Sequence, residues 1–427
     1  MYPFHVYRSM YERRRKKRRL ITALIVLIIV SAGAVAVFLV KSGWFAKKDS
    51  VETINIYDMV PSLIEIERGI YSRENYWIRE ESPPPVKVKG LYITGWSAGN
   101  AGKIEHYIEL CGTTEINALV IDIKEDRGNL TFISDISISR NSAAAVNMIR
   151  NPAETVSLLK SHGIYTIARI VCFKDPVYSA ENPELAIKDK NGGLWTDKSG
   201  NTWLDPYKTG AWDYIIDIAK ESAGLGFDEV QFDYIRFPTD GNINEIDYGS
   251  IAEEKTKAYV IGEFLEYARE KLKAENVYIS ADVFGIIAVS RLDSETIGQD
   301  LNIMARHADS ICPMIYPSHY ANKRQNGEGQ NINGILFEAP DKQPYEVIYN
   351  TLLLIKERLA DIDEDDCAAV RPYLQNFTAA YLGAGYYQEY TAKQLREQIQ
   401  AVYDAGFEEW IFWNASNIYS EDAFLLE

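Results

Sequence analysis

The fold class of this 427-residue chain is decided at residues 227–238, which read Phe227-Asp228-Glu229-Val230-Gln231-Phe232-Asp233-Tyr234-Ile235-Arg236-Phe237-Pro238. Within this stretch, residues 229–234 form a short, largely apolar run that is typical of a buried strand. The segment before it, from Ile215 to Gly226, has the period of a helix and ends near a glycine, which fits a left-handed helix cap. A helix that ends at a glycine and leads into a strand is the unit of a parallel sheet covered by helices.

Seven further runs of strand type alternate with longer segments of helical period. The same junction of helix, glycine and strand recurs from Leu158 to Gly163 and from Leu395 to Gly406. Because eight strands suffice to close a parallel sheet, the prediction is an α/β fold, a (β/α)8 TIM barrel. A doubly wound open sheet is the alternative, although no G-x-G-x-x-G motif follows the first run. The other runs are 88–94, 118–123, 165–171, 277–283, 310–316, 368–374 and 409–413.

The N-terminus predicts export and a membrane anchor. A basic segment, residues 1–20, precedes an uncharged run at 21–40 that is long enough to span a bilayer as one transmembrane helix. The positive-inside rule places the basic end in the cytoplasm and everything after the helix outside. The prediction is a single-pass signal-anchor in a bacterial cell membrane, with the lipid bilayer as a partner. A long signal peptide cleaved near Ser31-Ala32-Gly33-Ala34 is the alternative, and it exports the main domain as well.

Composition divides the chain in the same way. Residues 41–85 predict a stalk that closes with Ser82-Pro83-Pro84-Pro85, and 86–427 predict the barrel domain. The first 48 residues carry eleven Lys or Arg and one Glu, so the rest carries 34 basic and 60 acidic side chains, a formal charge of −26. Such an acidic domain argues against nucleic acid as a partner and disfavours polyanionic substrates.

Three carboxylates end predicted strands, where a barrel of this kind places its chemistry: Asp122, Asp233 and Asp282. Glycoside hydrolysis needs two carboxyl groups, one to protonate the leaving oxygen and one to attack the sugar or activate water. Asp233 has Arg236 three positions further on, and this cation would keep a nucleophile or base ionised. Asp282 lies between apolar neighbours that would keep an acid protonated.

A structural role is the alternative for each of these carboxylates, as the partner of an Arg or Lys in the barrel. It is strongest for Asp122, because Lys124 and Arg127 are close in sequence. Asp122 is therefore expected in substrate binding rather than in catalysis. Lys124 could form a Schiff base, but exposure to solvent or pairing with Asp122 is the expected role.

Aromatic residues near the strand ends predict a cleft that stacks against sugar rings. For some of them, Trp413 in particular, simple packing is the alternative. Metal and cofactor sites are not expected, because only His319 of the five histidines is near the barrel mouth and the four cysteines, expected as buried free thiols, form no CxxC pair. The expected substrate-binding residues besides Asp122 are Trp96, Trp203, Arg236, Tyr316, Trp413 and Asn414.

Together these residues give the chain a family resemblance. It resembles the glycoside hydrolase barrels of bacterial surface proteins, which are placed near the alpha-amylase-type TIM-barrel glycosidases. The resemblance covers about residues 86–419, and the strand at 229–234 is its most specific part. The motifs that carry it are Lys89-Gly90-Leu91-Tyr92-Ile93-Thr94, Asn117-Ala118-Leu119-Val120-Ile121-Asp122-Ile123-Lys124, residues 227–238 as quoted above, and Asp309-Ser310-Ile311-Cys312-Pro313-Met314-Ile315-Tyr316-Pro317.

The resemblance implies a hydrolase whose nucleophile is Asp233. The chain departs from the alpha-amylase pattern where it offers Asp282 in place of a glutamate, and where Gln375 and Asn376 stand in place of a stabilising aspartate. The expected function is cleavage of glycosidic bonds in an envelope or extracellular polysaccharide by Asp233 and Asp282. A non-catalytic carbohydrate-binding surface protein on the same barrel is the alternative.

Overall fold

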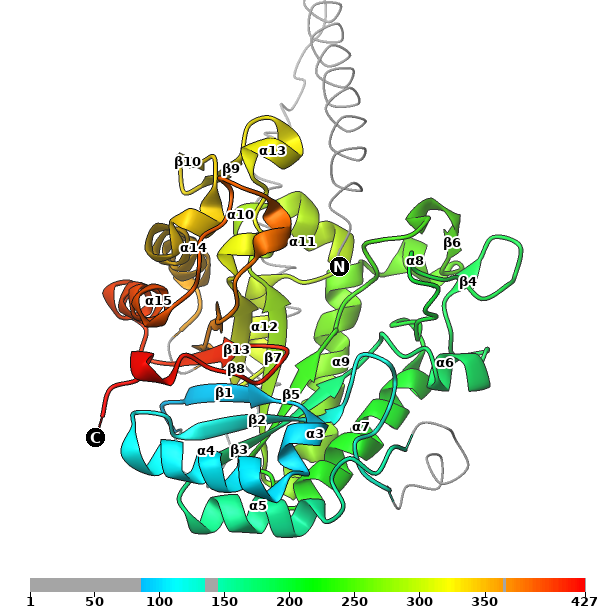
Figure 1. Cartoon of the computed structure of the whole chain (residues 1–427). Coiled ribbons are helices and arrows are strands. Elements are labelled where there is room, and N and C mark those ends of the chain that lie inside the picture. Colours follow the sequence, from blue (N-terminus) through cyan, green and yellow to red (C-terminus); the bar gives the residue numbers. More distant parts are fainter. Residues whose placement is uncertain (1–85, 135–144, 364–365, 427) are drawn as a thin grey trace, which may run out of the picture. The chain divides into compact units, whose positions relative to one another are not determined.

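Eight parallel strands close into a barrel in the computed structural model of the chain, which describes residues 86–134, 145–363 and 366–426 (Figure 1). The last strand in sequence pairs with the first, so no open edge remains between them. The (β/α)8 prediction is confirmed, and the open doubly wound sheet is excluded. Around the barrel the strands are β1 (Lys89–Ile93), β2 (Ala118–Lys124), β3 (Tyr165–Val171), β5 (Glu229–Asp233), β7 (Tyr278–Phe284), β8 (Ser310–Met314), β12 (Tyr373–Gln375) and β13 (Trp410–Trp413).

The seventh predicted strand, 368–374, is divided in two. Its first part, β11 (Ala369–Val370), pairs only with β8, and β12 continues the barrel after Arg371 and Pro372. Proline has no backbone N–H to give to a neighbouring strand, which accounts for the break. The Pro372 carbonyl still accepts from the Ile411 N–H at 3.0 Å, so the seam remains closed.

Helices cover the outer face of the barrel. In Figure 1, α4 and α5 lie against the β1–β3 side, and α14 and α15 lie beyond β8 and β13. The three predicted glycine caps are confirmed, with φ of 75° at Gly163, 98° at Gly226 and 88° at Gly406. The longer helices are α4 (Ala101–Thr113), α5 (Pro152–Ser161), α7 (Thr209–Gly224), α9 (Lys257–Leu272), α11 (Arg291–Ile297), α12 (Leu301–His307), α14 (Pro344–Leu359) and α15 (Ala392–Asp404).

Alternation along the strands separates the outer core from the barrel interior. In β5, Val230 and Phe232 belong to the large core beneath the helices, and Phe232 packs edge-on against Phe264 of α9. The side chains between them, Glu229, Gln231 and Asp233, point into the barrel because successive residues of a strand face opposite sides. One strand therefore contributes three polar groups to the interior, with Asp233 at its carboxyl end.

A buried ionic network fills the amino-terminal end of the interior. Arg371 Nη1 lies 2.8 Å from Glu229 Oε1, and Arg371 Nε lies 2.8 Å from Glu409 Oε2. Ser280 also donates to Glu229, and Ser310 accepts from Arg371. All of these groups are buried, so Arg371, between β11 and β12, is joined to β5, to β8 and to the residue that precedes β13, and Ser280 of β7 joins the network through Glu229.

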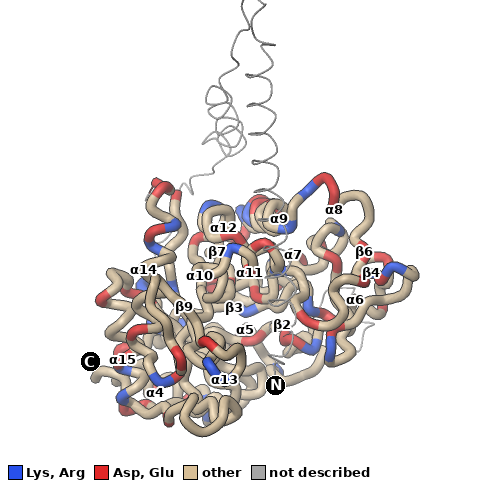
Figure 2. Tube along the Cα trace, turned by 90° about the horizontal axis from the view of Figure 1, so that it is seen from above, with Lys and Arg blue, Asp and Glu red and all other residues tan. Residues whose placement is uncertain are grey.

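Charged residues of both signs are interspersed over the outer helices and loops in Figure 2. The part of the chain that the structure describes contains no helix with the length and apolar character needed to cross a bilayer. The predicted transmembrane helix at 21–40 and the stalk at 41–85 lie outside the described residues, so these two predictions stay open.

Candidate active site

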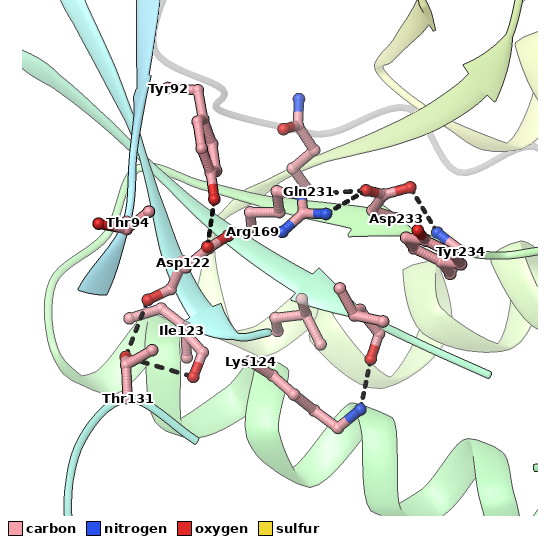
Figure 3. A network of polar contacts seen from close by, with 12 residues as sticks. Tyr92, Thr94, Asp122, Ile123, Lys124, Thr131, Arg169, Gln231, Asp233 and Tyr234 are labelled. Atoms are coloured by element: carbon pink, nitrogen blue, oxygen red, sulfur yellow. Dashed lines mark hydrogen bonds and ion pairs between the residues drawn. The ribbon is translucent and has the colours of Figure 1, made fainter. Parts of the chain in front are cut away.

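One guanidinium joins two of the three predicted carboxylates at the carboxyl ends of the strands. Arg169 of β3 donates to Asp233 Oδ2 from Nε at 3.0 Å and from Nη2 at 2.5 Å. Its Nη1 donates to Asp122 Oδ1 at 2.5 Å, and the Tyr92 hydroxyl donates to Asp122 Oδ2 at 2.5 Å. Figure 3 shows the guanidinium between the two carboxylates, with Tyr92 pointing down from β1. Four neighbouring strands thus meet in one hydrogen-bonded unit.

The chain turns sharply immediately after Asp233. Tyr234 has a φ of 52°, a left-handed conformation that is costly for a residue with a side chain. In this conformation the Tyr234 N–H donates to Asp233 Oδ1 at 2.6 Å. Both oxygens of Asp233 therefore accept hydrogen bonds, and these fix the orientation of the side chain. Strain of this kind is typical of sites where a side chain must be held in place.

Asp282 has the opposite surroundings. It is buried on β7, one position beyond the pair formed by Phe232 and Ala281, so it is the neighbour of Asp233 across the strands. Neither carboxyl oxygen has a hydrogen-bond partner among the described residues. Burial, and then the negative charge of Asp233, raise the pKa of Asp282 well above its ordinary range. The prediction that its surroundings favour the protonated acid agrees with this direction.

The cation beside Asp233 differs from the predicted one. Arg236 donates to the Phe237 carbonyl at 3.0 Å, and its guanidinium lies against the rings of Tyr234 and Phe284, 4.9 and 4.6 Å from their centroids. No described carboxylate forms an ion pair with it. The expectation that Arg236 is the cation beside Asp233 is therefore wrong, because Arg169 lies there instead.

Lys124 also differs from its expected role. Its side chain is fully buried, and Nζ lies 3.0 Å from Asp175 Oδ2 and 2.6 Å from the Val171 carbonyl oxygen. In Figure 3 it points away from Asp122. Lys124 is therefore neither solvent-exposed nor the partner of Asp122, and it fastens the chain after β3 to the outside of β2.

Aromatic rings surround the carboxylates. The half-buried Trp413 stacks on Tyr92 with centroids 6.0 Å apart, and it contacts Tyr316 at 5.9 Å and Phe377 at 5.5 Å. Trp96 is 64% exposed, on the short helix α3 (Gly95–Ala98) that follows β1. These positions are compatible with the predicted cleft.

Trp203 does not offer the open face that was expected. It is buried, and its indole N–H donates to Asp197 Oδ2 at 3.3 Å. Arg236 lies over its ring, 5.1 Å from the centroid. Trp203 thus packs beneath the loop that follows β3. Asn414, at the end of β13, is half-buried and donates to the Asn376 and Ile418 carbonyls.

The two amides that replace a stabilising aspartate have different surroundings. Gln375 is buried and donates to Asp341 Oδ1 at 2.9 Å and to the Phe377 carbonyl at 3.0 Å, so it fixes loops. Asn376 is buried, and its Nδ2 has no partner among the described residues. The four cysteines are free: Cys172 and Cys312 are buried, and Cys111 and Cys367 are half-buried.

Comparison with protein-family models identifies the family of the chain. The model is described as "Putative glycosyl hydrolase domain" and matches residues 90–419, most of the described chain. The chain belongs to this family of glycosyl hydrolase domains. The resemblance inferred from the sequence motifs is confirmed.

Solved structures extend the comparison of this glycosyl hydrolase domain. A hypothetical protein from Ruminiclostridium thermocellum is 44% identical over 45% of this chain and 97% of its own, with a TM-score of 0.42. The glycoside hydrolase domain of PgaB (BpsB) from Bordetella bronchiseptica is 12% identical over 79% of this chain and 98% of its own, with a TM-score of 0.57. The likeness to the second concerns the fold. Among curated proteins, none matches the chain.

Asp282 of this glycosyl hydrolase domain, whose carboxyl oxygens have no hydrogen-bond partner among the described residues, should lower the stability of the folded chain at neutral pH. We expect Asp282→Asn to raise the melting temperature of the full chain at pH 7 and to have less effect near pH 4. The pKa of Asp282 is raised on folding, so its contribution to stability is fully present below the unfolded value near 3.8 and is lost as pH rises. Thermal unfolding from pH 4 to 8 measures this, with the exposed Asp361→Asn as the matched control. Equal shifts at both ends of the range would contradict the expectation.

Proposed function

We propose that the barrel hydrolyses glycosidic bonds in an envelope or extracellular polysaccharide, with Asp233 as nucleophile or base and Asp282 as general acid. The observation that carries the proposal is the contrast between two carboxyl groups at the ends of adjacent strands. Asp233 accepts three hydrogen bonds, two of them from a cation, whereas the carboxyl oxygens of Asp282 have no hydrogen-bond partner among the described residues. Environments that separate the protonation states of neighbouring carboxyl groups assign the acid and the base.

Because Asp282 is buried, its side chain has to move when the substrate binds. Its oxygens are closed off from solvent, so the side chain must turn toward the mouth to reach a glycosidic oxygen. Because the carboxyl group has no hydrogen bond to lose within the described part of the chain, this rotation costs less than it would for a partnered acid. Asp233, held by Arg169 and by its own following N–H, stays in place while the acid moves.

Sugar units would lie against the aromatic residues of the mouth. Trp413 stands directly over the carboxylate unit through its contact with Tyr92. Trp96 is farther out, and its helix is tied down because Asn417 accepts from the Thr94 N–H at 2.9 Å and from the Ser97 hydroxyl at 2.7 Å. An exposed aromatic ring on such a fixed support suits stacking on a sugar ring without a large loss of entropy.

Trp96→Ala should raise the KM for a polymeric substrate about three- to tenfold and leave kcat nearly unchanged, because a stacking contact is worth about 0.5–1.5 kcal/mol. Steady-state kinetics of the full chain measure this. Leu158→Ala is the control, since Leu158 is also exposed but lies on the outer helix α5. A fall in kcat with an unchanged KM would argue against a sugar-binding role for Trp96.

A non-catalytic carbohydrate-binding protein is the second candidate. The observation that favours it is that both Asp122 and Asp233 are held in ion pairs, while Asp282 is closed off. Carboxylates fixed in this way could orient sugar hydroxyls without cleaving a bond. The two candidates differ in one outcome, the appearance of new reducing ends.

The experiment is incubation of the full chain with a panel of cell-wall and extracellular glycans, with Asp282→Asn run alongside. We expect new reducing ends from at least one glycan, with a rate that falls at alkaline pH in the wild type as Asp282 loses its proton. Retention of glycans without new ends would favour the binding protein. We also propose that the basic segment and helix at 1–40 anchor the protein in the membrane with the barrel outside, which protease treatment of intact cells would test.

A further inference from the structure

Every oxygen of Asp122 is already occupied in the described structure. Oδ1 accepts from Arg169 and Oδ2 accepts from Tyr92, and the carboxylate is buried. Because the carboxylate is buried, a sugar hydroxyl could reach it only by moving Arg169 or Tyr92 aside. Asp122 is therefore poorly suited to the substrate-binding role expected from the sequence, and it is well suited to holding Arg169.

The N–H donors of Arg169 are divided between two carboxylates. Nε and Nη2 both point to the same oxygen of Asp233, and Nη1 points to Asp122. The face of the guanidinium also lies 5.6 Å from the centroid of the Tyr92 ring. The planar fork is thus fixed from two sides, which a flexible lysine could not reproduce.

We propose that Arg169 is the positioning residue of the site, which fixes Asp233 and supplies the positive charge beside it, and that Asp122 and Tyr92 act as its anchor rather than as sugar ligands. The kinetic part of this inference rests on the proposed function. The electrostatic part of the inference does not rest on the proposed function, because it concerns the charge of the carboxyl cluster in the free protein.

Charge balance supports this division. Among the described residues, Arg169 is the only cation that contacts any of the three strand-end carboxyl groups, and it contacts two of them, Asp122 and Asp233. The single positive charge of Arg169 offsets only part of the negative charge of these two carboxylates. No cation in the described part of the chain contacts Asp282, so the cluster is more stable when Asp282 keeps its proton. The charged and titratable groups that act on Asp282 are Asp233, Arg169, Glu229 and Arg371, and those that Asp282 in turn affects include Tyr316, Tyr373, Cys172 and Cys312.

Kinetics of three full-length variants separate an anchor from a sugar ligand. Asp122→Asn should lower kcat with little change in KM, because Arg169 loses its anchor and then holds Asp233 less firmly. Arg169→Met should lower kcat about 10²-fold or more, because Asp233 loses the two hydrogen bonds that hold it in place. Arg169→Lys should recover little of kcat, because a lysine cannot reproduce the planar fork of the guanidinium. A rise in KM without loss of kcat in Asp122→Asn would overturn the anchor role.

Infrared spectroscopy tests the same proposal without a substrate. The protonated carboxyl band of Asp282 is identified in the wild-type chain by its loss in Asp282→Asn. In Arg169→Met this band should persist to higher pH, because the cation that favours ionisation of Asp282 is gone, whereas Arg169→Lys and the exposed-site control Arg291→Met should match the wild type. Identical titrations in Arg169→Met and wild type would overturn the proposal, whatever the outcome of the glycan assays.

Discussion

Asp233→Asn should reduce turnover by about 10³-fold or more, because it removes the group proposed to attack the sugar or activate water. The amide has nearly the same shape as the carboxylate, and its oxygen can still accept from the Tyr234 N–H. Release of reducing ends from the glycan identified for the wild type measures the loss. Binding of that glycan should be retained, since the stacking residues are untouched.

The matched control for this loss is Asp361→Asn. Asp361 is exposed and follows α14, away from the strand ends, so its substitution should leave turnover unchanged. Melting temperatures of both variants exclude a general loss of structure as the cause. Turnover by Asp233→Asn within tenfold of the wild type would show that Asp233 is not the attacking group.

Arg371→Met should destabilise the folded chain by about 3–5 kcal/mol, because it leaves two carboxylates buried without their cation. Glu229 and Glu409 both contact this guanidinium at 2.8 Å, at the end of the barrel opposite the site. The shift of the denaturant midpoint or of the melting temperature gives the magnitude. The expected loss of stability is a consequence of closing the barrel through a charged group rather than an apolar one.

Two comparisons define this effect. Arg291→Met removes an exposed i,i+4 pair with Glu295 and should change stability by no more than about 0.5 kcal/mol. Combining Arg371→Met with Glu229→Gln and Glu409→Gln should recover part of the loss, because the uncompensated charges are gone. Equal destabilisation by the single and the triple variant would indicate that packing of Arg371, rather than charge, is responsible.

The strands could be predicted because each is a local pattern. The strand at 229–234 and the seven other strands are each marked by a short apolar segment. The glycines at 163, 226 and 406 end helices because a glycine adopts a positive φ at little cost. The division of the seventh strand has a local cause too, because Pro372 has no backbone N–H to donate to a neighbouring strand. Asp122, Asp233 and Asp282 were found because a barrel brings its strand ends to one mouth.

The partners of these carboxylates could not be predicted from neighbours in sequence. Arg236 is three residues from Asp233, yet a residue three positions beyond a strand end does not face back into the barrel. Arg169 comes from another strand, and its signal was its place as the single charged residue of the 165–171 run. Burial of Trp203 and Lys124 likewise depends on how loops fold over the barrel, which periodicity does not encode.

The most direct test of the proposed hydrolase uses the Asp233→Asn full chain to capture its own substrate. The glycan from the panel that this variant retains is given to the wild-type chain, and new reducing ends are counted over time. The proposed mechanism predicts that the wild type cleaves the glycan that the variant only binds. If the wild type holds the same glycan intact, the protein is a carbohydrate-binding barrel and the two-carboxylate hydrolase is contradicted.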